Sequence, residues 1–409
     1  MASGIDIDRI RRETPGAGES VHLLACGSAL MPQPVVDAVV NHTLLEARIG
    51  GYEAHAQQHA VLDRVYDSCA AHIGAKRHEI ALVENATVAW CHAFYALPIK
   101  PGSRILTCEA EYAANYVALL QRARREGLSV EVVPSDAAGA LDLAALEATI
   151  DSDVGLLAMT WIPTNGGLVN PAAAAGAIAR RHGVPFLLDA CQAVGQMRID
   201  VAEIGCDFLS ATGRKFLRGP RGTGFLYVRE EWLNGSRTGG RTVEPLEPAM
   251  IDHFGAPWAS RDRYELRDDA RRFETWENAY ALRAGLGAAF DYAAGIGIDA
   301  IEARVRHLAD HCRALLAEDG RFGLRDLGHE RCGIVSFSVD GRAGDKAPDP
   351  RRLVAEMAAA GFAIGASDPA STRLDSERRG LPTLLRIAPH YYNTEDEIQR
   401  AVEALAGMV

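Results

Sequence analysis

The stretch FLLDACQ, residues 186–192, decides the fold, because a short apolar run in it ends abruptly in an acid. Such a run predicts a buried strand of a parallel sheet. The strand would carry Asp189 to the carboxyl edge of the sheet, where open α/β sheets bind their ligands. The sequence therefore predicts an α/β fold with a ligand site beside Asp189.

A second predicted strand, DFLS at residues 207–210, runs into a polar turn with a single lysine, Lys215, and then into the glycine-rich stretch 219–224. Pyridoxal 5′-phosphate (PLP) requires a lysine amine for covalent attachment and an acid that keeps its pyridine nitrogen protonated. The Ser/Thr–Gly turn would bring hydroxyls and backbone N–H groups to the phosphate. Alone, Asp189 is better explained as a helix cap and Lys215 as a surface charge. Together, before a loop that needs unusual backbone angles, they favour a PLP site.

Four motifs carry a resemblance to a known family: Asp189-x-x-Gln192, GCDF at 205–208, TGRK at 212–215 and GPxGxG at 219–224. The chain resembles class V of the aminotransferase fold (PLP fold type I) from about Val21 to its C-terminus. That group includes cysteine desulfurases, selenocysteine lyases, kynureninases, isopenicillin-N-epimerase-like proteins and the C–S lyase of ergothioneine biosynthesis. The resemblance implies a seven-stranded, mostly parallel sheet in a large domain, with a smaller α+β domain.

The order of predicted elements agrees with that architecture. Seven strands are expected in the first half of the chain, at 80–83, 104–108, 130–133, 155–160, 186–189, 207–210 and 224–228. Residues 1–29 are expected to form an arm and an initial segment, 30–294 the PLP-binding domain, and 295–409 the small domain, with a polar loop at 340–349. Residues 272–278 are expected to open a long helix.

Composition limits the class of protein. The 409 residues carry a net charge of −11 and no lysine/arginine run, which argues against a nucleic-acid surface. There is no apolar stretch near the length of a membrane span, and the N-terminus is too polar for a signal peptide, so we expect a cytoplasmic protein. The eight cysteines are scattered and the two histidine pairs at i,i+4 lack a zincin glutamate, so no metal is predicted.

The turn after the strand at 80–83 is the expected phosphate site. Asn85, Ala86 and Thr87 open a helix there, and a helix N-terminus suits a phosphate, although Asn85 and Thr87 are also good caps without any ligand. The family binds its cofactor phosphate at the matching turn. In relatives a partner-subunit threonine also reaches that phosphate; Glu277 stands at its position here, so Thr275 or Trp276 is the expected substitute in a homodimer.

The resemblance implies further site residues. Asn165 matches an asparagine beside the cofactor, although a plain Asn–Gly turn is the alternative; Gln192 and Thr212 belong to the cofactor motifs. Arg386 matches the arginine that binds the substrate α-carboxylate. Tyr112 stands where desulfurases carry a histidine, and a phenol can stack on a ring but is a poor proton shuttle near neutral pH.

These residues serve several reactions of an amino acid: transamination, β-elimination, epimerisation and decarboxylation. The loop at 366–374 lacks the sulfur-accepting cysteine of desulfurases. We therefore favour a lyase that cleaves the C–S bond of an S-conjugated cysteine, with an aminotransferase as the first alternative and an epimerase or decarboxylase after it. A non-catalytic PLP-binding regulator is disfavoured by the intact Asp189, Lys215 and Arg386, and a nicotinamide dehydrogenase by the lack of G-x-G-x-x-G after the first strand.

Overall fold

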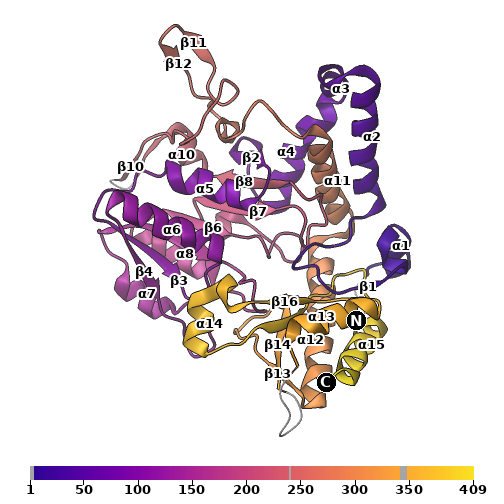
Figure 1. The fold of residues 1–409 in the computed structure, drawn as a ribbon. Helices are drawn as coiled ribbons and strands as arrows, with labels where there is room; N and C mark the ends of the chain where they lie inside the picture. The colour runs from indigo at the N-terminus through magenta and orange to yellow at the C-terminus, as the bar shows by residue number, and fades with distance from the viewer. Residues whose placement is uncertain (1–3, 239–240, 341–347) are drawn as a thin grey trace.

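The computed structural model describes residues 4–238, 241–340 and 348–409. Its centre is a seven-stranded sheet (Figure 1) with neighbouring strands in the order β2, β8, β7, β6, β5, β3, β4. In that order, they span Ile80–Val83, Gly224–Val228, Phe208–Thr212, Phe186–Asp189, Val154–Thr160, Arg104–Cys108 and Ser129–Val133. Six of these strands run in one direction, and β8 runs in the opposite direction between β2 and β7. The predicted seven-stranded, mostly parallel sheet is confirmed.

Strand β6 shows why this sheet has a core on both faces. Phe186 and Leu188 belong to one buried cluster, whereas Leu187 belongs to another, as the alternation of side chains along a strand requires. The first cluster includes residues of α2 (Gln33–Ile49), α4 (His59–Ile73), α8 (Ala172–Arg181) and α11 (Tyr280–Ile296); the second includes residues of α5 (Ala86–Ala96) and α6 (Ala113–Glu126). With helices on both faces, the ligand-accessible part of the sheet is its carboxyl edge.

A second, four-stranded antiparallel sheet lies in the lower part of Figure 1. Its order is β13 (Phe322–Leu324), β14 (Val335–Val339), β17 (Leu384–Ile387), β16 (Gly365–Ser367), and α12 (Ile298–Asp319), α13 (Pro350–Ala359) and α15 (Glu395–Gly407) share its core. A smaller α+β unit is thus confirmed. The divisions after residues 29 and 294 stay predictions. The predicted loop 340–349 lies mostly outside the described residues.

The N-terminal segment packs against both units. Helix α1 (Ile7–Arg12) buries Ile10 completely. Strand β1 (Val21–His22) pairs in parallel with β15 (Phe362–Ala363), and Leu24 bridges to Ala388. The described part of this segment therefore contributes buried side chains to the cores of both units, such as Ile10 and Leu23.

One element begins later than predicted. Residues 272–278 do not open a helix: a 3₁₀ turn (Ala270–Phe273) is followed by irregular chain with a bend at Trp276, and α11 begins only at Tyr280. The Trp276 N–H donates to Asp252 Oδ2 (2.7 Å) and Asn278 Nδ2 to the Thr275 carbonyl (3.0 Å). The Asn278 bond is local and competes with helix formation, and the bond to Asp252 holds the Trp276 N–H in a tertiary contact.

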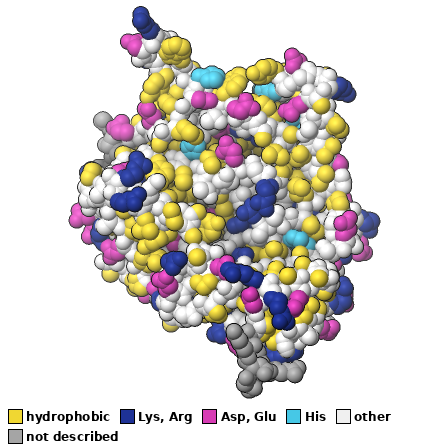
Figure 2. Space-filling model, in the orientation of Figure 1, with side chains coloured by type: hydrophobic (Ala, Val, Ile, Leu, Met, Phe, Trp, Pro, Cys, Tyr) yellow, Lys and Arg dark blue, Asp and Glu magenta, His cyan; other side chains and the backbone are white. Residues whose placement is uncertain are grey.

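The other helices and strands lie between or beside the two sheets. They are α3 (Gly51–Gln57), α7 (Leu143–Thr149), α9 (Val201–Ile204), α10 (Glu230–Asn234), α14 (Arg373–Arg379), β9 (Ser236–Thr238), β10 (Arg241–Val243), β11 (Trp258–Ser260) and β12 (Arg263–Tyr264). The β11–β12 hairpin projects from the top of the molecule in both views (Figures 1 and 2). Within the described ranges, no helix has the length and apolar character needed to cross a membrane.

Candidate active site

The carboxyl edge of the seven-stranded sheet opens into a cavity of about 600 Å³, where β6 and β7 end and α5 begins. Its wall brings together seven residues predicted from the sequence: Asn85, Ala86, Thr87, Tyr112, Asp189, Thr212 and Lys215. The other lining residues are Glu84, Val88, Asn115, Cys191, Arg214, Arg221 and Gly222. The fold thus gathers residues from five separate stretches of the chain around one space.

Asp189 is the buried acid of this cavity, and both of its carboxylate oxygens are oriented by the protein. Oδ1 accepts a hydrogen bond from the Cys191 N–H (2.8 Å), and Oδ2 accepts one from Asn115 Nδ2 (2.9 Å). In the part of the chain that the structure describes, no lysine or arginine forms an ion pair with Asp189. A buried carboxylate without a cation suits a bound group that brings a positively charged N–H.

A second buried carboxylate, Glu111, lies behind Asp189. Its donors include the N–H groups of Tyr112 (2.8 Å) and Thr160 (3.1 Å) and the side chains of Thr107 (2.9 Å) and Asn115 (2.9 Å). Burial raises the pKa of Glu111, and hydrogen bonds from Thr160 and Asn115 oppose that rise. Because Asn115 Nδ2 donates to Glu111 as well as to Asp189, a single amide joins the two acids.

Lys215 stands in the turn after β7, half-buried in the cavity wall. The turn is closed by hydrogen bonds from the Gly213 N–H to the Thr223 carbonyl (3.0 Å) and from the Gly219 N–H to the Gly213 carbonyl (2.8 Å). A Cβ at Gly213 would lie 2.3 Å from Thr223 Oγ1, so only glycine fits. Among the described residues, no side chain pairs with the Lys215 amine, which leaves it available to a ligand.

The phosphate end of the predicted site is the N-terminus of α5. Asn85 caps the helix by accepting from the Val88 N–H (3.0 Å), whereas the first N–H groups of a helix, here those of Ala86 and Thr87, have no acceptor within it. Arg214 and Arg221 line the same cavity, and neither has a carboxylate partner within the described ranges.

Desolvation lowers the pKa of the Arg214 guanidinium, and the charge of Arg221 lowers it further. Two neighbouring cations without counter-ions beside a helix N-terminus suit a phosphate. Basic side chains also gather near the centre of the face shown in Figure 2.

Taken together, these groups fit PLP. Asp189 would hold the pyridine nitrogen, Lys215 the aldehyde carbon, and the α5 N-terminus with Thr212, Arg214 and Arg221 the phosphate. Asp189 and the basic groups carry charges opposite to those of the pyridinium and the phosphate, and Lys215 supplies the amine that condenses with the aldehyde.

Tyr112 caps α6 at the mouth of the cavity and is 38% exposed. Desolvation raises the pKa of its phenol, as do the charges on Cys191 and Asp189, whereas Arg214 and Arg386 lower it. The phenol therefore keeps its proton near neutral pH, and it can stack or donate a hydrogen bond but cannot act as a base.

Three predicted residues lie outside the cavity wall. Asn165 donates to Asp375 Oδ2 (3.0 Å), and Gln192 Nε2 donates to the Cys26 carbonyl (3.2 Å). Arg386 Nη1 donates to both the carbonyl (2.6 Å) and Oγ1 (2.8 Å) of Thr164. The Arg386 Nε is buried without a hydrogen-bond partner among the described residues, and its charge reaches Tyr112. The roles of these three residues stay predictions.

Sequence reasoning missed Asn115, Glu111, Cys191, Arg214 and Arg221. The first two had a detectable signal, because Glu111 precedes Tyr112 in the turn after the strand at 104–108 and Asn115 lies in the first turn of the helix that follows, so both lie near the same sheet edge. The other three stand within the quoted cofactor motifs.

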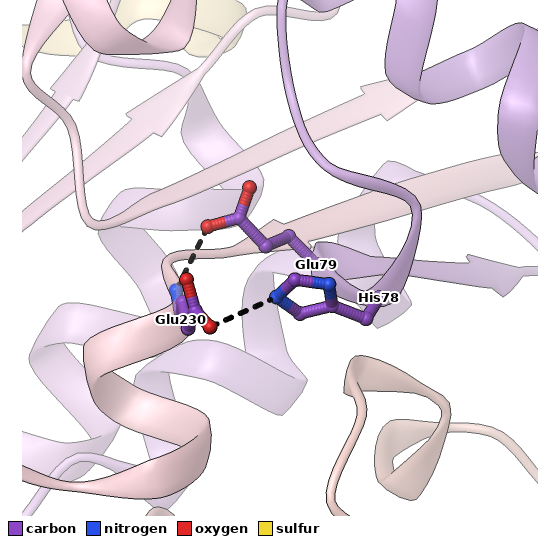
Figure 3. Close-up of side chains that lie close together, drawn as sticks. All are labelled: His78, Glu79 and Glu230. Atoms are coloured by element: carbon purple, nitrogen blue, oxygen red, sulfur yellow. Dashed lines mark hydrogen bonds and ion pairs between the residues drawn. The ribbon is translucent and has the colours of Figure 1, made fainter.

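A separate cluster of possible metal ligands, His78, Glu79 and Glu230, is shown in Figure 3. Its acids are already used: Glu79 accepts from the Glu230 N–H (2.9 Å) and the Lys76 N–H (2.9 Å), while Glu230 pairs with the Lys76 ammonium and with His78 (3.5 Å). The cluster is therefore explained as a surface ion-pair network.

Comparison with known proteins connects this geometry to a family. The family described as aminotransferase class-V matches residues 21–401. A probable cysteine desulfurase of Methanothermobacter thermautotrophicus is 29% identical over 98% of both chains, and a cysteine desulfurase of Dickeya dadantii is 30% identical over 98% of this chain and 96% of its own. Among solved structures, the apo cysteine desulfurase from Thermococcus onnurineus NA1 has a TM-score of 0.88 at 25% identity, covering 100% of this chain and 99% of its own.

The match confirms the predicted family and fold type, and it agrees with a cavity whose charges complement PLP. The chain therefore belongs to the aminotransferase class-V family, and it is a PLP-dependent enzyme of fold type I.

Proposed function

We propose that the enzyme cleaves the C–S bond of an S-substituted cysteine by β-elimination. An S-substituted cysteine and water then give a free thiol, pyruvate and ammonium, with no net oxidation or reduction. The names of the curated relatives support attack on this bond, since a cysteine desulfurase removes sulfur from cysteine. What distinguishes the two reactions is whether the sulfur remains on the enzyme.

The state of the thiols carries this proposal. Cys191 is the one cysteine that lines the described cavity. Burial raises its pKa to about 12, with the charge on Asp189 as the next cause. A thiol rather than a thiolate at neutral pH is a poor nucleophile, so Cys191 is unsuited to take sulfur from a substrate.

The segment at 366–374 offers no alternative acceptor. It contains no cysteine, and it is folded into β16, a 3₁₀ turn (Pro369–Thr372) and the start of α14. Asp368 fixes it through Arg351 (2.7 Å) and Thr383 (3.1 Å). A sulfur that leaves the substrate must therefore depart with its own substituent.

The proposed roles of the residues follow from their positions. PLP, when bound, withdraws electrons from the α-carbon of an amino acid attached to it. Lys215, the one amine in the described cavity wall, would remove the α-proton and return a proton to the leaving sulfur. The protonated Tyr112 would donate a hydrogen bond at the cavity mouth. Arg386 would bind the α-carboxylate, as the family resemblance implies, and its charge already acts on Tyr112 in the cavity wall.

Product analysis tests the reaction. The holoenzyme is incubated, without any keto acid, with a panel of S-alkyl and S-aryl cysteines and, separately, with cysteine, and thiol (sulfide from cysteine), pyruvate and ammonia are quantified. We expect sustained equimolar release of all three. A persulfide on any cysteine of the enzyme, found by mass spectrometry, would instead make it a desulfurase.

The same assay separates the alternatives. An aminotransferase would stop after one turnover until a keto acid was supplied. An epimerase would exchange the α-proton for deuterium from solvent without releasing thiol, and a decarboxylase would release carbon dioxide.

We also propose that the enzyme is a cytoplasmic homodimer. All eight cysteines are unpaired, which suits a reducing compartment. Large apolar side chains on and beside α2 are exposed, notably Tyr52 (78%), Leu44 (62%) and Val61 (50%), as on a surface that another protein covers. Light scattering after size exclusion would give the mass in solution, and a monomer would contradict the dimer.

A further inference from the structure

Arg218 is a buried arginine three residues after Lys215. It is 1% exposed, and no acid forms an ion pair with it in the described part of the chain. Its guanidinium lies over the rings of Tyr292 (5.6 Å), Tyr391 (5.0 Å) and Tyr392 (4.8 Å). A buried charge without a counter-ion is costly, and three aromatic faces compensate part of that cost.

Every nitrogen of this guanidinium has an acceptor. Nε donates to the Leu30 carbonyl (2.7 Å), Nη1 to the Tyr391 hydroxyl (2.9 Å) and Nη2 to Thr14 Oγ1 (2.6 Å). Thr14 and Leu30 belong to the N-terminal segment, whereas Tyr391 lies near the C-terminus. Arg218 therefore joins both ends of the chain to the turn that carries Lys215.

The backbone of Arg218 is strained. Its φ of 64° is the one positive value among the described non-glycine residues, and the left-handed region disfavours a residue with a Cβ. Its N–H donates to the Lys215 carbonyl (2.9 Å), which closes the turn. The contacts of the guanidinium compensate this strain, and strain held in this way often marks a functional position.

The turn is held from both sides. The Ala29 N–H donates to the Arg214 carbonyl (2.9 Å), and His390 Nε2 donates to the Phe216 carbonyl (2.6 Å). His390 follows β17, the strand that carries Arg386. The carbonyls on either side of Lys215 are thus bonded to segments from opposite ends of the sequence.

We propose that Arg218 is a positioning residue for Lys215, and that it also holds the turn in register with the segment that follows Arg386. Arg218 does not line the cavity; it acts through the backbone of the turn. The proposal depends on PLP as the cofactor and is independent of which bond the enzyme cleaves.

The test compares two ligands that differ in their need for Lys215. PLP has an aldehyde that reacts with the lysine amine, whereas pyridoxamine 5′-phosphate has the same ring and phosphate but no aldehyde. Arg218→Met should slow covalent PLP attachment on the order of tenfold, because about 1 Å of misplacement can cost up to ~10²-fold in rate. It should leave the affinity for pyridoxamine 5′-phosphate nearly unchanged. Attachment is followed by borohydride trapping and mass spectrometry of the Lys215 peptide, and affinity by equilibrium dialysis.

Arg122 supplies a matched control. It is also buried (4%), lies over the Phe94 ring (5.1 Å) and donates to the Leu97 carbonyl (2.6 Å), although unlike Arg218 it also pairs with an acid, Glu126 (2.7 Å). Its helix, α6, is separate from the Lys215 turn, so Arg122→Met should lower the melting temperature but leave PLP attachment unchanged. The positioning role is wrong if Arg218→Met reduces PLP attachment and pyridoxamine 5′-phosphate affinity by the same factor. It is also wrong if Arg218→Met changes neither quantity more than Arg122→Met does.

If Arg218→Met fails to fold, a milder substitution, Tyr391→Phe, still tests the proposal. Tyr391→Phe keeps the ring over Arg218 and removes only the hydroxyl that accepts from Nη1. It should slow PLP attachment in the same direction by a smaller factor, again without affecting pyridoxamine 5′-phosphate. Normal attachment in Tyr391→Phe, together with a misfolded Arg218→Met, would assign Arg218 to folding alone and overturn the proposal.

Discussion

Replacing Asp189 by asparagine changes one oxygen for an NH₂ group and removes one charge. Two donors point at this side chain, the Cys191 N–H at 2.8 Å and Asn115 Nδ2 at 2.9 Å. Asparagine has a single acceptor, so one of the two donors must face another donor. Asn115 cannot simply turn its amide, because its Nδ2 also donates to Glu111 (2.9 Å). A buried polar group left unpaired costs about 1–3 kcal/mol. Loss of the repulsion between Asp189 and Glu111 offsets part of this cost, so we expect the cofactor-free protein to lose at most that much stability.

The effect on the rate should be larger. If the Asp189 carboxylate balances the charge on the pyridine nitrogen, its loss removes an attraction of about 4 kcal/mol for two unit charges ~4 Å apart at an effective dielectric constant of ~20. At about 1.36 kcal/mol per factor of ten, kcat falls about 10³-fold. Steady-state thiol release by the PLP-saturated variant measures this loss.

Asp207 offers the control, because it is a buried aspartate at the opposite end of β6. It accepts from the Phe186 N–H (2.8 Å) and from Trp232 Nε1 (3.1 Å), and its Oδ1 lies 3.4 Å from Arg229 Nε. Because Asp207→Asn also breaks this ion pair, it should cost at least as much stability, seen in urea unfolding, with little change in kcat. If Asp189→Asn retains kcat within about tenfold of the wild type, Asp189 is not the partner of the ring nitrogen.

Four further outcomes are expected. Lys215→Ala should abolish borohydride-stable PLP attachment, and a label on another lysine would contradict the assignment. Arg386→Lys should raise KM for the amino acid more than it lowers kcat, since a point charge replaces a planar fork; unchanged KM would exclude Arg386 as the carboxylate anchor. Cys191→Ala should leave turnover nearly unchanged, and alkylation of the wild-type thiol should keep rising with pH beyond the ordinary thiol value of about 8.5, since the pKa of Cys191 is raised to about 12. A plateau below pH 9 would show an activated thiolate. Gly195→Ala should lower the melting temperature and slow PLP attachment, because Gly195 has a φ of +89° and a Cβ there would lie 2.3 Å from the Leu217 nitrogen behind the Lys215 turn; an unchanged variant would show that the turn can yield.

The sequence by itself determined the sheet and the two reactive groups at its edge. Short apolar runs such as 186–188 can only be buried, and the polar residue that ends each run must then lie at the carboxyl edge. This local rule placed Asp189, the turn after the second strand placed Lys215, and the resemblance of the TGRK motif added Thr212. The helix cap at Asn85 followed from the same reasoning about strand ends and unpaired N–H groups.

Only the tertiary structure decided which groups surround those residues. Asn115 joins Asp189 to Glu111 because α6 begins beside the end of β6, a contact between residues 74 positions apart in the chain. The environment of Cys191, which keeps it a thiol, depends on packing that no local pattern encodes. The strained Arg218 is held by hydrogen bonds to Thr14 and Tyr391, which lie far from it in sequence. Strand periodicity is a local property of the chain, whereas burial and the pairing of charges depend on which distant segments meet.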